Sequence, residues 1–77
     1  MKDWYLLNVK KGRERDVKKM LERDLDVEVG IEEVISGYVR VYMEDTIELR
    51  YKIRKYPFII GFIGIDNKSN RLIPIYN

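Results

Sequence analysis

The stretch GYVRVYMEDTIELRYKIRKYPFIIGFIG, residues 37–64, contains three successive patterns that predict a strand, a helix and a second strand. Its first part, residues 37–43, alternates between small apolar side chains and larger or polar ones. A period of two predicts a half-buried strand with its two valines and its methionine on one face. The opposite face of this predicted strand carries Tyr38, Arg40 and Tyr42.

A helix is predicted next, over residues 46–56, because the apolar side chains there fall on one helical stripe. Basic residues crowd its last turn, where they complement the helix dipole. Asp45 and Glu48 stand three residues apart, as in a capping box with aspartate in place of serine or threonine. Pro57 is expected to end the helix.

The apolar run FIIGFIGI, residues 58–65, predicts a last strand buried against the core. It is too short for a membrane span, which needs about 20 apolar residues. Gly61 and Gly64 are expected inside this strand, at points where neighbouring backbone comes close.

Outside this stretch, the aromatic and β-favouring residues 4–9 predict a first strand. Residues 13–25 have apolar side chains at helical spacing among many charges, which predicts an amphipathic helix. Residues 26–31 alternate again and predict another strand. A turn-rich loop follows over 66–70, and the segment 71–76 is expected to be extended, at a sheet edge or outside the sheet because of its proline.

The resulting order is strand, helix, strand, strand, helix, strand. This βαββαβ order is typical of ferredoxin-like α+β domains, in which helices pack on a four-stranded, mainly antiparallel sheet. At 77 residues the chain has room for a single domain, so one domain is expected over residues 1–77.

The first and third strands are central neighbours in such a sheet. Alternation gives each of them one face that carries the following residues: Trp4, Leu6, Asn8, Tyr38, Arg40 and Tyr42. If these residues face away from the helices, they form an aromatic platform with an embedded arginine. The alternative is that the segment 71–76 covers this face as part of the core, since large exposed apolar patches are normally covered or functional.

Composition excludes several kinds of chemistry. The chain has no histidine and no cysteine, which excludes disulfides, most zinc sites and histidine-activated nucleophiles. Its adjacent acidic residues point apart on an extended chain, and its glycines do not form a phosphate-binding loop. We therefore expect no enzyme, no metal and no cofactor. No apolar stretch follows a basic region at the amino terminus, so a cytoplasmic protein is expected.

The sequence motifs resemble the NGN domain of the NusG family of transcription elongation and antitermination factors. WYLLNVKKGRERDVKKML, residues 4–21, is similar to the opening strand, glycine turn and first helix of that domain. Residues 32–64 resemble its glutamate-rich approach to a GYV strand, its acidic helix start and its GF-G strand. LIPI, residues 72–75, resembles its proline-containing tail. The resemblance covers Trp4 to Ile75, and no KOW domain, which would follow in the family, is expected within residues 1–77.

This resemblance implies a domain that binds RNA polymerase at the clamp helices of the largest subunit and promotes processive elongation. It also implies a monomer without a membrane contact. The implied polymerase-binding residues are Leu6, Tyr38 and Arg40, with Trp4 and Tyr42 beside them on the same face. A possible contact with non-template DNA falls to Lys10, Lys11, Arg13 and Arg15.

The chain departs from the family at Arg40, which stands where an apolar residue is usual and makes the expected docking face more polar. Two alternatives to polymerase binding remain. One is a single-stranded RNA-binding module in which sheet aromatics stack on bases, although SGYVRVYM, residues 36–43, lacks the aromatic spacing of that class. The other is a small interaction domain that shares only the fold.

Overall fold

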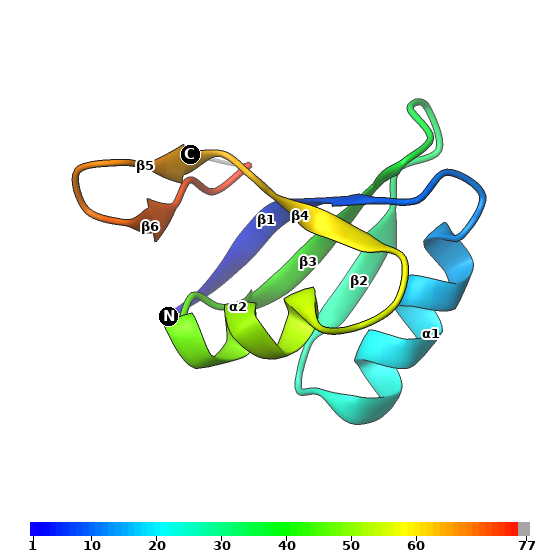
Figure 1. The fold of residues 1–77 in the computed structure, drawn as a ribbon, viewed down its shortest axis with the longest axis horizontal. Coiled ribbons are helices and arrows are strands. Elements are labelled where there is room, and N and C mark those ends of the chain that lie inside the picture. Colours follow the sequence, from blue (N-terminus) through cyan, green and yellow to red (C-terminus); the bar gives the residue numbers. More distant parts are fainter. Residues whose placement is uncertain (76–77) are drawn as a thin grey trace.

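The computed structural model describes residues 1–75 and has an α+β architecture, in which two helices accompany a four-stranded antiparallel sheet (Figure 1). The predicted fold class is confirmed at this level. The elements are β1 (Lys2–Val9), α1 (Glu14–Asp24), β2 (Glu28–Ile31), β3 (Tyr38–Glu44), α2 (Ile47–Arg54), β4 (Ile59–Ile63), β5 (Ile65–Asp66) and β6 (Arg71–Leu72).

The four-stranded sheet has the order β2-β3-β1-β4, and each neighbouring pair is antiparallel. The long strands β1 and β3 lie at its centre, as the sequence predicts. Their register places Trp4 opposite Tyr42, and Leu6 opposite Arg40. Residues that are opposite in register share a face of the sheet, so the two predicted residue sets lie on the same side.

The core lies between one face of the sheet and the two helices. Alternate residues of β1 and β3 are buried there, and each helix adds the apolar stripe that its spacing predicts. The largest fully buried side chains are Leu7, Val9, Val17, Leu21, Val39, Val41, Met43 and Ile53. This face of the sheet is called the helix side below, and the opposite face is called the open face.

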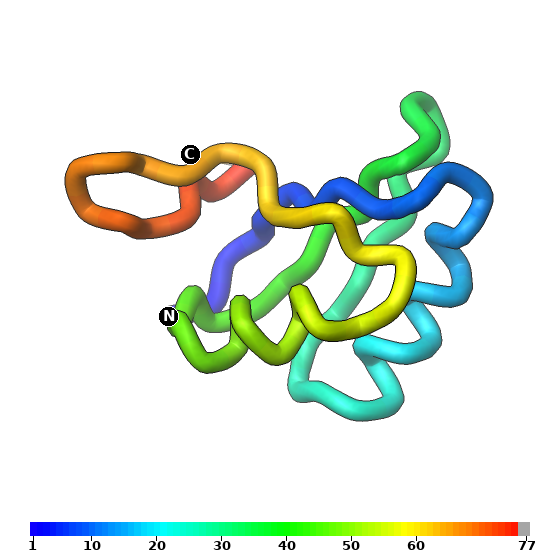
Figure 2. Tube along the Cα trace, in the orientation of Figure 1, coloured from blue at the N-terminus to red at the C-terminus, as the bar shows by residue number. Residues whose placement is uncertain are grey.

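The six predicted elements are followed by two more strands. β5 and β6 pair with each other in a small separate hairpin, which projects from the sheet beyond β4 (Figure 2). The sequence predicts only a loop and an extended segment here, because strands of two residues are too short to show a period. Leu72 of β6 is nevertheless 5% exposed and belongs to the core. The hairpin is thus attached to the domain by a buried side chain.

The predicted last strand is present and packs on the core, but it is only partly buried. β4 is an edge strand with β1 as its one neighbour in the sheet, and its register shifts at a bulge beside Val9. Ile60 is 66% exposed and Ile63 is 43% exposed, while Ile59 and Phe62 pack partly on the core. An edge strand at the end of a small sheet has too little structure around it to be covered on both faces.

The prediction that neighbouring backbone comes close to the two glycines of this run is wrong for Gly61. It is partly right for Gly64, where the Ile73 carbonyl oxygen would lie 3.8 Å from an added Cβ. A side chain at Gly61 would meet nothing within 4 Å, so no close backbone approach explains this residue. Gly64 lies between β4 and β5, outside both strands, with φ +84°. That left-handed conformation suits glycine and lets the chain turn from the sheet into the hairpin.

Helix α2 is capped by Thr46 and not by the predicted pair of Asp45 and Glu48. The Thr46 Oγ1 accepts a hydrogen bond from the Leu49 backbone N–H at 3.1 Å. Asp45 turns away from the helix start and binds Arg50 and the backbone of Leu72 instead. The carboxylate that was expected to cap a helix therefore connects that helix to the hairpin.

Candidate functional site

The five residues predicted to bind a partner all lie on the open face. They are half-buried, and no helix within residues 1–75 covers them. Alternation places them there because their neighbours in sequence point into the core. The residues concerned are Trp4, Leu6, Tyr38, Arg40 and Tyr42.

At one end of the open face, Trp4 and Tyr42 form a cross-strand aromatic pair. Their ring centroids are 5.1 Å apart and the ring planes are inclined by 44°. Such pairs contribute about 0.5–1.5 kcal/mol beyond the area that they bury. The two rings pack on each other at an angle, so they do not form the flat platform that the sequence suggests.

Arg40 lies across the sheet and does not project into solvent. Its guanidinium passes over Gly30 of β2, where an added Cβ would be only 2.7 Å from Nη2. Its Nη1 donates a hydrogen bond to Glu32 Oε2 at 3.2 Å. Glycine at position 30 therefore gives the arginine room to lie flat and to reach its partner. Gly30 was not among the predicted site residues, although a glycine in an alternating strand is a recognisable signal of close approach.

Beside this ion pair, the open face has a hollow of about 420 Å³. Its lining is apolar or aromatic except for one carboxylate, and it consists of Leu6, Glu32, Ile35, Tyr38, Ile63 and Ile75. We call this feature the apolar hollow. Leu6 and Tyr38 were predicted from alternation. The three isoleucines were not, because they come from a loop, an edge strand and the C-terminal tail, which only the folded chain brings together.

The C-terminal segment forms an edge of the open face and does not cover it. The Ile75 N–H donates to the Trp4 carbonyl at 2.9 Å, so the tail runs beside β1. Ile75 then lines the apolar hollow, while Leu72 is buried on the helix side. The alternative in which this segment buries the open face is wrong for residues 71–75; Tyr76, which it also included, lies outside the described residues.

The loop that carries Ile35 is fixed to the start of α1. The Gly37 N–H donates to Glu14 Oε2 at 2.6 Å, and this bond lowers the pKa of the Glu14 carboxyl. The Val9 N–H donates to the Gly37 carbonyl at 2.8 Å. Gly37 has φ +93°, a conformation that favours glycine. These bonds hold one side of the apolar hollow in place.

The four basic residues with a predicted DNA contact lie in the β1–α1 turn and at the start of α1, and all are exposed or partly exposed: Lys10, Lys11, Arg13 and Arg15. Arg13 pairs with Asp16 at 3.3 Å and lies 5.1 Å from the centre of the Phe58 ring. Its side chain therefore already has contacts within the domain. The exposure of the other three side chains is compatible with an external partner.

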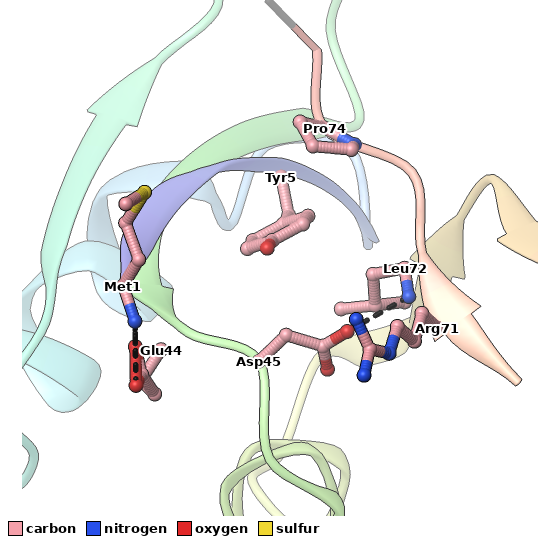
Figure 3. A pocket seen from close by; sticks show the side chains of 7 residues that line it. All are labelled: Met1, Tyr5, Glu44, Asp45, Arg71, Leu72 and Pro74. Atoms are coloured by element: carbon pink, nitrogen blue, oxygen red, sulfur yellow. Dashed lines mark hydrogen bonds and ion pairs between the residues drawn. The ribbon is translucent and has the colours of Figure 1, made fainter. Parts of the chain in front are cut away.

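A larger hollow, of about 540 Å³, lies on the helix side and contains none of the predicted site residues (Figure 3). It is lined by Met1, Tyr5, Glu44, Asp45, Arg71, Leu72 and Pro74. Burial raises the pKa of the Tyr5 hydroxyl, and the nearby carboxylates of Asp45, Asp3 and Glu44 raise it further.

Within residues 1–75 there is no cluster of three or more side chains that could hold a metal ion. In the same part of the chain, no helix has the length and apolar character that crossing a bilayer requires.

Comparison with known proteins supports the resemblance found in the sequence. A search of curated proteins gave no significant match. A family model described as "Transcription termination factor nusG" matches residues 2–77, which is nearly the whole chain. This match agrees with an open sheet face whose central strands carry the motifs of the NGN domain. The chain belongs to the NusG family, through the NGN domain, and has a role in transcription elongation or termination.

Proposed function

We propose that this domain binds RNA polymerase at the clamp helices of the largest subunit, through the open face, and thereby promotes processive elongation. The observation that carries the proposal is the apolar hollow, because it lies where the family resemblance places the docking residues Leu6 and Tyr38. A patch that is apolar, concave and bordered by charge is typical of a protein-docking surface.

The chemistry of the hollow suits a helical partner. Amphipathic helices dock by placing apolar side chains from successive turns into such depressions. Tyr38 would be the main anchor, since aromatic residues at the centre of an interface contribute most of the binding energy. Glu32 and Arg40 form an ion pair at the edge of the hollow. The carboxylate of the one and the guanidinium of the other can orient a charged partner.

The finer points of the proposal concern the rest of the domain. The exposed residues Lys10, Lys11 and Arg15 would lie toward non-template DNA in the transcription bubble. Residues 1–77 would act as a single NGN domain and as a monomer, with four-stranded ferredoxin-like topology. Coupling through a KOW domain is no part of the function proposed for these residues.

Single-stranded RNA is the second candidate for the open face, and the Trp4–Tyr42 pair is the observation that favours it. Bases stack on exposed aromatic rings, with about 1–3 kcal/mol per base. Two features favour protein instead. The two rings are inclined to each other, and the guanidinium on this face is already paired with a carboxylate.

The test is an NMR titration of the isotope-labelled domain with an isolated clamp-helix fragment. We expect shifts at Leu6, Tyr38 and their strand neighbours. Tyr38→Ala should weaken binding at least tenfold, which corresponds to about 1.4 kcal/mol. The matched control is Tyr51→Ala, which removes an exposed tyrosine of α2 outside the apolar hollow and should leave the affinity unchanged.

The same titration separates the two candidates. Protein docking should depend weakly on salt, whereas RNA binding should weaken steeply as salt rises, because phosphate contacts release counterions. A flat titration at millimolar fragment would contradict polymerase docking. If single-stranded RNA then shifted the open face with a steep salt dependence, the second candidate would replace the first.

A further inference from the structure

One wall of the apolar hollow belongs to the C-terminal part of the chain. Ile75 forms part of that wall, and its backbone is attached to β1 through the Trp4 carbonyl. The Ile73 N–H donates to the Gly64 carbonyl at 2.8 Å, which ties the tail to the start of the hairpin. The position of Ile75 therefore depends on where the β5–β6 hairpin lies.

A hairpin of two-residue strands has little stability of its own and needs support from the rest of the domain. That support comes from the helix side. Asp45 Oδ2 accepts a hydrogen bond from the Leu72 N–H at 2.8 Å, and Figure 3 shows the carboxylate directed at β6. Arg50 Nη2 donates to the Asn70 carbonyl at 2.8 Å. The two side chains thus bind backbone groups on either side of Arg71.

Asp45 and Arg50 also bind each other. Asp45 Oδ1 accepts from Arg50 Nε at 2.6 Å, and the two side chains are 11% and 14% exposed. This is the most buried ion pair found within residues 1–75. Each oxygen of the carboxylate has a partner, and the guanidinium bonds in two directions. A buried pair with its hydrogen bonds satisfied holds its surroundings in one arrangement.

We propose that Asp45 and Arg50 are positioning residues of the docking site. From the helix side of the sheet they fix β6 and the tail, so that Ile75 forms a wall of the apolar hollow on the open face. Neither residue lines that hollow, so neither is expected to touch the docked partner there. The docking role rests on the proposed function, whereas the effect of the pair on the tail does not.

The variants are Asp45→Ala, Ile75→Ala and the double variant. Asp26→Ala is the matched control, because Asp26 forms an ion pair with Lys2 in which the aspartate is almost fully exposed. Two quantities are measured. The first is the hydrogen exchange of the Leu72 and Ile75 amides in the free domain, and the second is affinity for the clamp-helix fragment.

In Asp45→Ala, the Leu72 and Ile75 amides should exchange at least tenfold faster, while the amides of β1 and β3 that face each other keep their protection. Fragment affinity should fall about three- to tenfold in Asp45→Ala and in Ile75→Ala. The double variant should bind no more weakly than Ile75→Ala, because the pair acts through that side chain. The Asp26→Ala control should match the wild type in both measurements.

A second substitution, Arg50→Lys, keeps the charge but lacks the fork that reaches Asp45 and Asn70 together. If Asp45→Ala does not fold, Arg50→Lys takes its place in both measurements. It should also lower the exchange protection of the Leu72 and Ile75 amides and the affinity for the fragment. Unchanged protection of Ile75, or affinity losses that multiply in the double variant, would overturn the positioning role. If the wild-type domain does not bind the fragment, the proposed function and the docking role of the pair are both overturned. The exchange data would still decide whether Asp45 and Arg50 hold the tail in place.

Discussion

The two faces of the central strands differ in what they do, although their residues alternate along the same sequence. On the helix side, Leu7 and Val39 are completely buried. One position away, Leu6 and Tyr38 lie on the open face and remain half-buried around the apolar hollow. Packing on the helices supplies stability on one face, and incomplete covering leaves the other face accessible for the proposed docking.

The faces also differ in how they are assembled. The helix side is filled by side chains whose local spacing already marks them as buried. The open face adds groups that have no pattern in common, such as Gly30, Ile35 and Ile75. Many side chains of the core are thus marked as buried by their local spacing. The open face depends instead on a few residues that come together only when the chain has folded.

The largest expected effect compares adjacent leucines. Leu7→Ala should lower the free energy of unfolding by about 2–5 kcal/mol, because it leaves a cavity in a packed core. Leu6→Ala should cost clearly less, about 1 kcal/mol or below, but should weaken binding of the clamp-helix fragment. Chemical denaturation and titration measure the two quantities. Equal stability losses at both positions would show that the open face is also core.

A smaller effect is expected at the start of α2, which helps to cover the helix side. Thr46→Ala removes the side chain that caps the Leu49 N–H, and should destabilise the domain by about 1 kcal/mol. Thr46→Ser keeps the hydroxyl and serves as the control, with stability near that of the wild type. A thermal melt that did not distinguish alanine from serine would argue against this cap.

Two glycines of the sheet give a matched pair of smaller changes. Gly30→Ala forces the Arg40 guanidinium away from β2, because the new methyl group would lie 2.7 Å from Nη2. Gly30→Ala should therefore break the Arg40–Glu32 hydrogen bond and change the affinity for the clamp-helix fragment. The free energy of unfolding should change by about 1 kcal/mol or less. Gly61→Ala places its methyl group in open space. It should leave fragment affinity unchanged, and the free energy of unfolding should be unchanged or slightly higher. Arginine side-chain NMR signals follow the displacement; identical spectra for the two variants would count against it.

The smallest effect is a pH dependence of the helix layer. The Arg23 guanidinium, together with the Tyr56 hydroxyl at 2.9 Å, lowers the pKa of Asp24 from 3.8 to about 2. Because the folded pKa is the lower one, the contribution of Asp24 to stability is complete above about pH 4 and is lost as the pH falls toward 2. Asp24→Asn should flatten the stability curve in this window. Asp26→Asn leaves these contacts in place and should retain the wild-type slope.

Much of the fold was predictable from the sequence. The α+β class, the two helices, the central position of β1 and β3 and the residues on each of their faces all follow from local periods of 2 and 3.6. These periods can be recognised in the sequence because each helix or strand must bury one side, so its apolar residues recur at the period of that element. Leu6 and Tyr38 were found in this way, without reference to any distant part of the chain.

Other features depend on which segments meet. The edge position of β4 and the choice of Thr46 over Asp45 as the helix cap have no local signal strong enough to decide them. Gly30 signals a close approach within its strand, but not that Arg40 is the side chain that lies over it. Asp45 is available to the hairpin only because β6 packs beside it. The elements and their buried sides can therefore be predicted from the sequence, since these depend on neighbours within one or two turns. The walls of the apolar hollow cannot, because a loop, an edge strand and the tail lie side by side only once the strands have paired.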